Sequence, residues 1–179
     1  MSEPTVIELG RRDLLVVAGL PGAGKTTMLR HAAGALPVLD SDEVRERLTA
    51  VLPKATPYRY YRPFVHAWHR FRVLTRAVSR CGPLVVHEPS TRASTRTLLA
   101  TLGALTGRRL RLLYLDVTPE QALAGQRDRG RLIRPRSFAR HVRRAESWRE
   151  ELLAEQVPPG WHSVQVISRS TAEHAMLVG

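Results

Sequence analysis

Short apolar runs alternate along this chain with segments whose apolar residues recur at helical spacing. The clearest run is residues 14–18, which are all apolar and lead through a glycine-rich turn into a helix-compatible segment, 25–33. Further runs predict strands at residues 38–39, 84–86, 110–115 and 164–167. Helices are predicted at residues 42–52, 64–80 and 94–106, from Thr118 onward, and at 137–155.

The alternation of strands and helices predicts the fold class. It favours an α/β fold, a three-layer sandwich in which helices cover both faces of a parallel, roughly five-stranded sheet. Since no repeat or low-complexity linker divides the chain, we expect residues 1–179 to form a single domain. Residues 1–12 are interpreted as a polar lead-in without core residues, and residues 53–63 as a loop. Ligands of such sheets bind outside the carboxyl ends of the strands.

Arginine dominates the charge of the chain. Lysine and arginine together number 28 against 16 acidic residues, a net charge of +12, and only Lys25 and Lys54 are lysines. This excess fits a polyanionic partner such as nucleic acid, and it equally fits a solvated basic surface. Cys81 is the single cysteine, and no apolar run approaches the roughly 18 residues of a membrane span. We therefore expect a cytoplasmic protein without a membrane partner.

A phosphate-binding pattern lies between the first strand and its helix. Residues 19–26 read G-x-x-x-x-G-K-T, in which glycines let several backbone N–H groups converge on one anion at the positive end of the helix dipole. The residues predicted to bind the phosphates of ATP are Gly19, Gly22, Ala23, Gly24, Lys25, Thr26 and Thr27. Lys25 would reach the β- and γ-phosphates, and Thr26 would coordinate Mg²⁺. The alternative, a glycine-rich turn with a surface lysine, is disfavoured by the flanking strand and helix.

Two aspartates follow the second predicted strand, which we expect beside the first. Asp40 or Ser41 can cap the next helix, while Asp42 and Arg45 are three positions apart and share a helix face. A kinase that phosphorylates a hydroxyl needs a carboxylate to take the proton and a cation to hold the acceptor. Asp42 is therefore the candidate base, with Asp40 and Arg45 as acceptor contacts, unless the aspartates only cap the helix.

The chain resembles the small P-loop kinases. The likeness covers about residues 14–144 and rests on the glycine-rich loop, the D-S-D-x-x-R segment at 40–45, the apolar strand 84–86 with its polar tip, and the R-x-x-x-R spacing at 127–131. This group includes polynucleotide 5′-hydroxyl kinase, zeta-toxin-type sugar-nucleotide kinases, chloramphenicol phosphotransferase and gluconate kinase. The resemblance implies that Asp42 is the general base, that Arg45 contacts the acceptor, and that Arg127 and Arg131 face the transferring phosphate from an arginine-rich lid at about 126–137.

The arginine-rich lid also has a direct argument. Arg127 and Arg131 are spaced i, i+4 and would share one face of a helix. An arginine that closes over a transferring phosphoryl group increases the rate by about 10³- to 10⁵-fold. The alternative is that the five arginines between residues 127 and 136 form a solvated basic face.

The chain departs from the family pattern at the end of strand 84–86. The family usually has an aspartate there that helps to hold Mg²⁺, whereas this chain has His87 and Glu88. Glu88 could complete a metal site with Thr26, or it could be a structural group. Further candidate acceptor contacts are Thr91, Arg92 and Tyr61.

Tyr61 lies in the predicted loop 53–63, where tyrosines and arginines are interleaved. Such a loop can stack nucleic-acid bases, select a small molecule, or pack back onto the following helix. Together these observations favour an ATP- and Mg²⁺-dependent kinase that phosphorylates a hydroxyl, possible acceptors being a nucleic-acid 5′ end, a nucleotide-like molecule, an antibiotic or a sugar. The alternative from another class is a nucleotide-dependent, nucleic-acid-binding regulatory protein that hydrolyses ATP and phosphorylates nothing.

Overall fold

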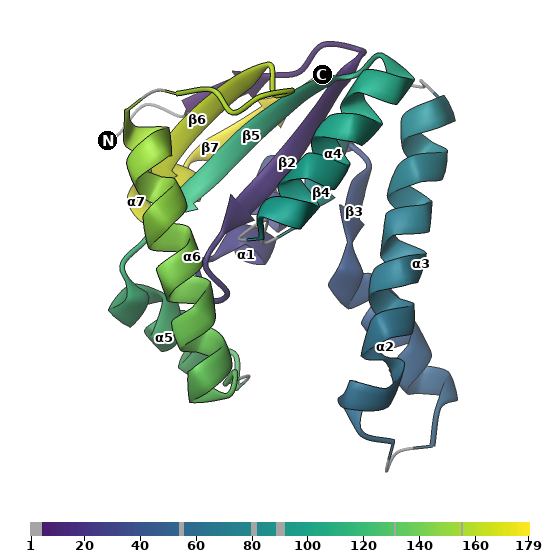
Figure 1. The fold of residues 1–179 in the computed structure, drawn as a ribbon, viewed down its shortest axis with the longest axis vertical. Coiled ribbons are helices and arrows are strands. Elements are labelled where there is room, and N and C mark those ends of the chain that lie inside the picture. The colour runs from purple at the N-terminus through teal and green to yellow at the C-terminus, as the bar shows by residue number, and fades with distance from the viewer. Residues whose placement is uncertain (1–4, 54–55, 80–81, 89–91, 131, 155) are drawn as a thin grey trace.

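A parallel five-stranded sheet forms the centre of the molecule. The computed structural model describes residues 5–53, 56–79, 82–88, 92–130, 132–154 and 156–179, and the strand order in its main sheet is β3, β4, β2, β5, β6. These strands are β3 (Val38–Asp40), β4 (Leu84–His87), β2 (Asp13–Gly19), β5 (Arg109–Asp116) and β6 (Ser163–Ser168). Each predicted strand is present, and the α/β sandwich is confirmed (Figure 1).

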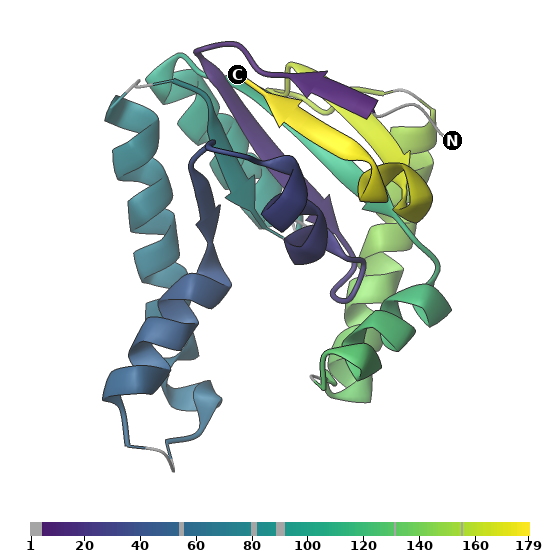
Figure 2. The same ribbon diagram turned by 180° about the vertical axis from the view of Figure 1, so that it is seen from behind.

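Helices cover both faces of this sheet. They are α1 (Lys25–Ala32), α2 (Ser41–Val51), α3 (Tyr58–Ser79), α4 (Ala93–Thr106), α5 (Pro119–Asp128), α6 (Pro135–Leu153) and α7 (Arg169–Glu173). Figures 1 and 2 show α3, α4 and α6 on one side of the sheet and α1 on the other. Consecutive residues of β2 point to opposite faces, so Leu14 shares a core cluster with Trp148 of α6, whereas Leu15 shares one with Met28 of α1. None of the helices in the described residues is long and apolar enough to cross a membrane.

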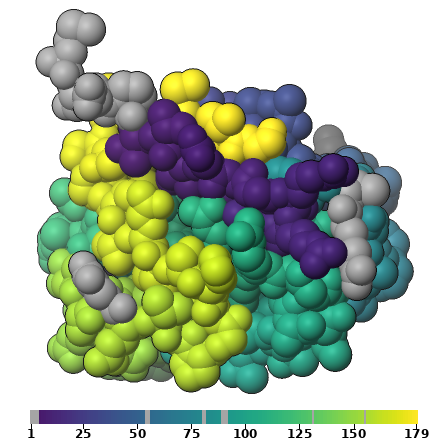
Figure 3. Space-filling model, turned by 90° about the horizontal axis from the view of Figure 1, so that it is seen from above, coloured from purple at the N-terminus to yellow at the C-terminus, as the bar shows by residue number. Residues whose placement is uncertain are grey.

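A second, two-stranded sheet joins the two ends of the chain. β1 (Thr5–Glu8) pairs in parallel with β7 (Ala175–Val178), and Ile7 and Leu177 are buried in the core cluster that contains α1. Figure 3 shows the purple N-terminal strand against the yellow C-terminal one. The prediction that the N-terminal segment contributes nothing to the core is therefore wrong for Thr5–Glu8. A four-residue strand has little local pattern when its partner lies at the opposite end of the sequence.

Two further expectations about the fold are corrected. β3 does not lie beside β2, because β4 is inserted between them and pairs with both. The segment predicted as a loop up to Pro63 is helical from Tyr58 onward, so α3 includes Pro63. In its first turn the Tyr58 and Tyr61 rings meet edge to face at 5.2 Å, and the Arg45 guanidinium lies 4.5 Å from the Tyr58 ring centre. Tertiary packing here outweighs local propensity.

Candidate active site

The loop between β2 and α1 has the geometry of a phosphate-binding loop. Gly19, Gly22 and Gly24 all have positive φ angles, of 138°, 96° and 105°, which residues with a side chain adopt only at a cost. The loop also touches α5 closely: a Cβ on Gly22 would collide with the carbonyl of Ala122, and a Cβ on Gly125 would collide with the carbonyl of Gly22. Glycines on both sides of this contact let α5 approach the loop.

Lys25, the first residue of α1, lies inside the loop. Its side chain is only 4% exposed, and Nζ donates hydrogen bonds to the carbonyls of Gly19 and Leu20, both at 2.9 Å. Burial, and next the positive charge of Arg129, lower the pKa of Lys25 to about 8. The ammonium group is thus held at the loop, but its charge is less stable than that of an exposed lysine.

Acidic groups at the strand ends oppose this lowering of the Lys25 pKa. The charges of Asp40, Glu88 and Asp42 all raise it, so these three carboxylates lie within electrostatic reach of the loop lysine. Asp42 is half-buried in the first turn of α2, where a negative charge is favourable. The structure therefore brings the candidate base and the candidate phosphate-binding lysine to the same edge of the sheet.

Thr26 and Glu88 can be tested as ligands of Mg²⁺. The Thr26 Oγ1 atom is buried without a hydrogen-bond partner among the described residues, an unfavourable state that a metal–oxygen bond would relieve. Glu88 follows β4, and its carboxylate lies 3.9 Å from Nε2 of His69. Mg²⁺ usually keeps several waters and needs only one or two protein oxygens in addition to phosphate. These two oxygen donors fit such an ion, and the metal role of both residues stays a prediction.

Asp40 is held by two partners at the start of α2. Its Oδ1 accepts the backbone N–H of Asp42 at 2.8 Å, so of the two caps considered Asp40 is the one observed, and its Oδ2 lies 2.6 Å from Nδ1 of His87. Burial raises the pKa of Asp40, but the hydrogen bond and charge of His87 and the bond from Asp42 outweigh it and lower the pKa overall. Because both oxygens have protein partners, the observed role of Asp40 is structural; acceptor binding by Asp40 stays a prediction.

His87 and His69 are site residues to which the sequence assigned no role. His87 is the last residue of β4, where the resemblance leads one to expect an aspartate, and it anchors Asp40. His69 of α3 is 1% exposed, and burial lowers its pKa to about 4, so that the folded protein holds it neutral. One sequence signal could have suggested the His87–Asp40 pair. A histidine follows the predicted strand 84–86, and an aspartate follows the predicted strand 38–39.

Helices α2 and α3 form one wall beside Asp42. Arg45 packs on the Tyr58 ring, and the Tyr61 hydroxyl lies 3.2 Å from Thr49 Oγ1. Glu43 accepts a hydrogen bond from Arg72 at 2.7 Å, which ties α2 to α3. Arg45 and Tyr61, two predicted acceptor contacts, therefore lie on adjoining helices, and their roles stay predictions.

The opposite wall is formed by α5 and the start of α6. Buried Gln126 connects it to the loop, since Nε2 donates to the carbonyl of Pro21 at 2.9 Å and Oε1 accepts from the backbone N–H of Ile133 at 3.0 Å. α5 ends at Asp128, so the expected helical face shared by Arg127 and Arg131 is not observed. Arg127 is exposed in the last turn of α5.

Two predicted site residues, Arg131 and Thr91, lie outside the described residues. Arg129, which the sequence did not single out, lies close enough to Lys25 to lower its pKa, and its Nε donates to the carbonyl of Gly125 at 3.2 Å.

Basic side chains from three helices gather between these walls. His141 of α6 is half-buried, and burial, followed by the charges of Arg144, Arg92, Lys25 and Arg62, lowers its pKa to about 4. Arg92 precedes α4 as its N-cap residue, and Arg62 belongs to α3. These cations give the space facing the loop a positive potential.

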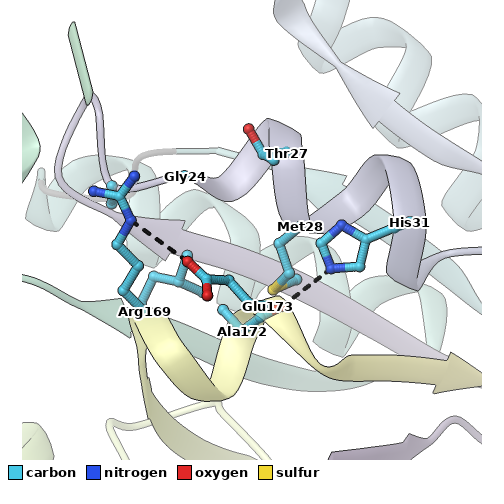
Figure 4. Close-up of a pocket in the computed structure, with 9 residues that line it drawn as sticks. Gly24, Thr27, Met28, His31, Arg169, Ala172 and Glu173 are labelled. Carbon is cyan, nitrogen blue, oxygen red and sulfur yellow. Dashed lines mark hydrogen bonds and ion pairs between the residues drawn. The ribbon is translucent and has the colours of Figure 1, made fainter. Parts of the chain in front are cut away.

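A small cavity lies on the other side of the loop, next to α7 (Figure 4). Its volume is about 70 Å³. It is lined by Ala23, Gly24, Thr27, Met28, His31, Leu115, Arg169, Ala172 and Glu173. Arg169 and Glu173 form an ion pair at 4.0 Å across its rim, and His31 Nε2 lies 3.2 Å from the carbonyl of Ala172. The cavity thus combines loop backbone with apolar and polar side chains.

Comparison with known families identifies the fold. A family model described as AAA domain (AAA_33) matches residues 14–152, which span the loop, both walls and most of the sheet. The chain belongs to this family. ATP binding is typical of the AAA_33 family, and its solved structural neighbours are small P-loop kinases, as the resemblance implied. No curated protein matches the sequence.

Three solved structures illustrate the similarity. A structure of the PezAT toxin–antitoxin system of Streptococcus pneumoniae is 18% identical, with a TM-score of 0.63, and the match covers 96% of this chain and 69% of that one. Shikimate kinase from Acinetobacter baumannii, solved with shikimate, is 25% identical, with a TM-score of 0.54 and coverage of 89% and 86%. The Pnkp1/Rnl/Hen1 RNA repair complex contains a chain that is 14% identical, with a TM-score of 0.60 and coverage of 84% and 47%. At these identities the likeness is one of fold.

Proposed function

We propose that this AAA_33 protein transfers the γ-phosphoryl group of ATP to a hydroxyl of an acceptor, with Asp42 as the general base. The observation that carries the proposal is the position of Lys25, which is buried in the phosphate-binding loop within electrostatic reach of Asp42. A lysine that neutralises phosphate oxygens and a carboxylate that can take the acceptor proton are the two groups that hydroxyl phosphorylation requires.

These groups account for the proton and for the bonds that form and break in the transfer. Asp42 accepts the proton of the acceptor hydroxyl as its oxygen bonds to the γ-phosphorus, and the bond to the bridging oxygen of ADP breaks. Loop N–H groups and Lys25 stabilise the charge on the phosphates. Mg²⁺, held through Thr26 with Glu88 nearby, would supply further positive charge to the β- and γ-phosphate oxygens. Arg129 and Arg127 are the candidates for the cation that faces the transferring group from the α5 side.

The acceptor that fits best carries negative charge, as a nucleic-acid 5′ end or a nucleotide-like molecule does. The support is a set of cations near His141, which are Arg62 of α3, Arg92 just before α4, and Arg144 of α6. An uncharged antibiotic or sugar would leave this positive potential unused. The similarity in fold to Pnkp1, a chain of an RNA repair complex, agrees with a nucleic-acid acceptor.

Labelled γ-phosphate transfer tests the proposal. The parent chain is incubated with labelled ATP, Mg²⁺ and a panel of acceptors: oligonucleotides with 5′-hydroxyl ends, nucleosides, aminoglycosides and sugars. Lys25→Ala should abolish transfer, and Asp42→Asn should reduce it by about 10²- to 10⁴-fold while ATP binding is retained. Glu46→Gln, an exposed change on the same helix, is the matched control and should leave transfer unchanged. Normal transfer by Asp42→Asn would remove Asp42 from the mechanism.

A second candidate function is nucleotide-dependent binding of nucleic acid without phosphorylation. It is favoured by His87 in place of the usual aspartate and by the net charge of +12. In this case labelled ATP would yield only free phosphate, and the chain would bind oligonucleotides with an affinity that falls steeply with salt.

A further inference from the structure

A second cavity lies between α5 and the start of α6, two segments that Figures 1 and 2 show side by side. Its volume is about 600 Å³, far larger than that of the cavity beside α7. Ligand sites in proteins usually have volumes of about 300–1,000 Å³. This α5–α6 cavity is therefore large enough for an organic ligand.

Apolar side chains form most of the wall of the α5–α6 cavity. Leu123 comes from α5, Ile133 from the segment between the helices, and Phe138 and Val142 from α6. Phe138 and Val142 also pack against the core cluster that contains α1, so the fold itself holds this part of the wall in place. Because the wall is mostly aliphatic, it suits an aliphatic chain, which gains from dispersion contacts without needing a ring to stack on.

The charged residues in this wall are two arginines, Arg127 of α5 and Arg143 of α6. Within the part of the chain that the structure describes, neither guanidinium forms an ion pair or a hydrogen bond. Their surroundings are basic as well, since residues 127–144 contain eight arginines and a single acidic residue, Asp128. The cavity thus combines an apolar wall with a positive potential, which favours a ligand that is apolar and negatively charged.

We propose that the α5–α6 cavity binds an aliphatic carboxylate, with its hydrocarbon chain against the apolar wall and its carboxylate paired with the arginines. Carboxylate is the anion whose geometry a guanidinium matches with two parallel hydrogen bonds. The site is separate from the phosphate-binding loop, none of whose residues lines it. The proposal therefore goes beyond the phosphotransfer proposed above and does not depend on it.

A free carboxylate is favoured over an anionic membrane surface. Binding to a bilayer requires apolar side chains that project from the protein into the lipid. Leu123, Ile133, Phe138 and Val142 are instead partly buried in the wall of a hollow between two helices. A single hydrocarbon chain can enter such a hollow, whereas the surface of a bilayer cannot.

Isothermal titration calorimetry of the full chain without nucleotide, with decanoate as the probe, tests the proposal. For a ligand of this size we expect a dissociation constant of about 10–100 µM. Octanoate should bind about five- to fifteenfold more weakly, because each buried CH₂ group contributes a similar free energy. Decan-1-ol has the same chain without the charge and should bind at least about tenfold more weakly than decanoate. No binding of decanoate at about 1 mM, or equal binding of decan-1-ol, would overturn the proposal.

Matched variants separate the cavity from general attraction to a basic protein. Arg127→Gln/Arg143→Gln should weaken decanoate binding at least about tenfold. Arg136→Gln/Arg140→Gln removes the same charge from two exposed positions of α6 outside the cavity, and it should bind decanoate like the parent. An equal loss in both double variants would show that decanoate responds only to net charge, and the proposed site would then be wrong.

Three further measurements locate the ligand. Leu132→Glu places a carboxylate at an exposed position of the cavity wall and should weaken binding, whereas Leu153→Glu, an exposed change at the end of α6 outside the cavity, should not. Lys25→Ala should bind decanoate like the parent; a loss of binding would place the carboxylate at the phosphate-binding loop and overturn the proposal. So would a chain that binds vesicles of phosphatidylcholine and phosphatidylglycerol but not free decanoate.

Discussion

The pair formed by Asp40 and His87 can be tested by removing the Asp40 carboxylate. Asp40→Ala loses two interactions: the cap of α2, in which Oδ1 accepts the Asp42 N–H at 2.8 Å, and the contact of Oδ2 with His87 Nδ1 at 2.6 Å. Loss of a cap costs about 1 kcal/mol. Loss of a charge-assisted hydrogen bond in a mostly buried site costs about 1.5–3 kcal/mol. We expect Asp40→Ala to lower the free energy of unfolding by about 3 kcal/mol at pH 7.

Urea unfolding of matched variants separates these two terms. Thr118→Ala removes a capping side chain of α5 that has no histidine partner, so it should cost about 1 kcal/mol. Asp40→Asn keeps a capping oxygen but removes the charge. Its loss of unfolding free energy should fall between those of Thr118→Ala and Asp40→Ala. If Asp40→Ala loses no more than Thr118→Ala, the His87 contact does not stabilise the protein and the reasoning fails.

A double-mutant cycle then isolates the pair. Asp40→Ala, His87→Ala and the double variant should give a coupling free energy of at least about 1 kcal/mol, the range found for contacting residues in one hydrogen-bond network. The two changes should also reduce phosphate transfer by a similar factor, because each displaces the first turn of α2 that carries Asp42. Additive losses of stability would show that the two residues act separately.

Three further predictions concern the loop and its surroundings. Because the pKa of Lys25 is lowered to about 8, ATP affinity should fall as pH rises through about 8, and Arg129→Gln should move this midpoint upward in a fluorescent-nucleotide titration. The pKa of His69 is lowered to about 4 in the folded protein, so between pH 6.5 and 4 the unfolded chain binds more protons than the folded protein. The free energy of unfolding should therefore fall as the pH drops through that window, and it should fall less steeply in His69→Gln. Helix propensity alone would make Gly125→Ala about 1 kcal/mol more stable than the parent. We expect it instead to lower both stability and ATP affinity, because the new Cβ collides with the Gly22 carbonyl. A more stable variant would refute this.

Elements with a strong local signal could be predicted from the sequence. β2 is apolar at almost every position because both of its faces are covered, and the glycines after it meet a backbone requirement that no other residue satisfies well. The cap of α2 was predicted to be Asp40 or Ser41, and Asp40 is the one observed; the prediction was possible because capping depends on the next three residues only. These features are encoded within about ten residues of one another.

Features that depend on distant partners could not be predicted in this way. β1 is a strand because β7 pairs with it, and the turn that starts at Tyr58 contacts Arg45 of α2 through the Tyr58 ring. The place of β4 between β3 and β2 is also a non-local property, since strand order is not written in the periodicity of any one segment.

The same distinction applies to the candidate site. The loop residues were identified because their chemistry and spacing lie in one segment, whereas Gln126 and Arg129 act through contacts with Pro21 and Lys25, far away in the sequence. The sequence shows only a glutamine beside an arginine-rich segment, and the burial of Gln126 becomes visible only in the fold.

The electrostatics of Lys25 connect these observations. Carboxylates at the ends of β3 and β4 stabilise its positive charge from one side, while Arg129 destabilises it from the other, so the charge of the loop depends on both walls. His87 strengthens the first influence, because it keeps Asp40 ionised next to the loop. The histidine that replaces the family's aspartate therefore preserves negative charge at this edge by holding a carboxylate of the neighbouring strand. On this reasoning His87→Asp would bring a second carboxylate against Asp40, and mutual repulsion would weaken the cap that positions Asp42.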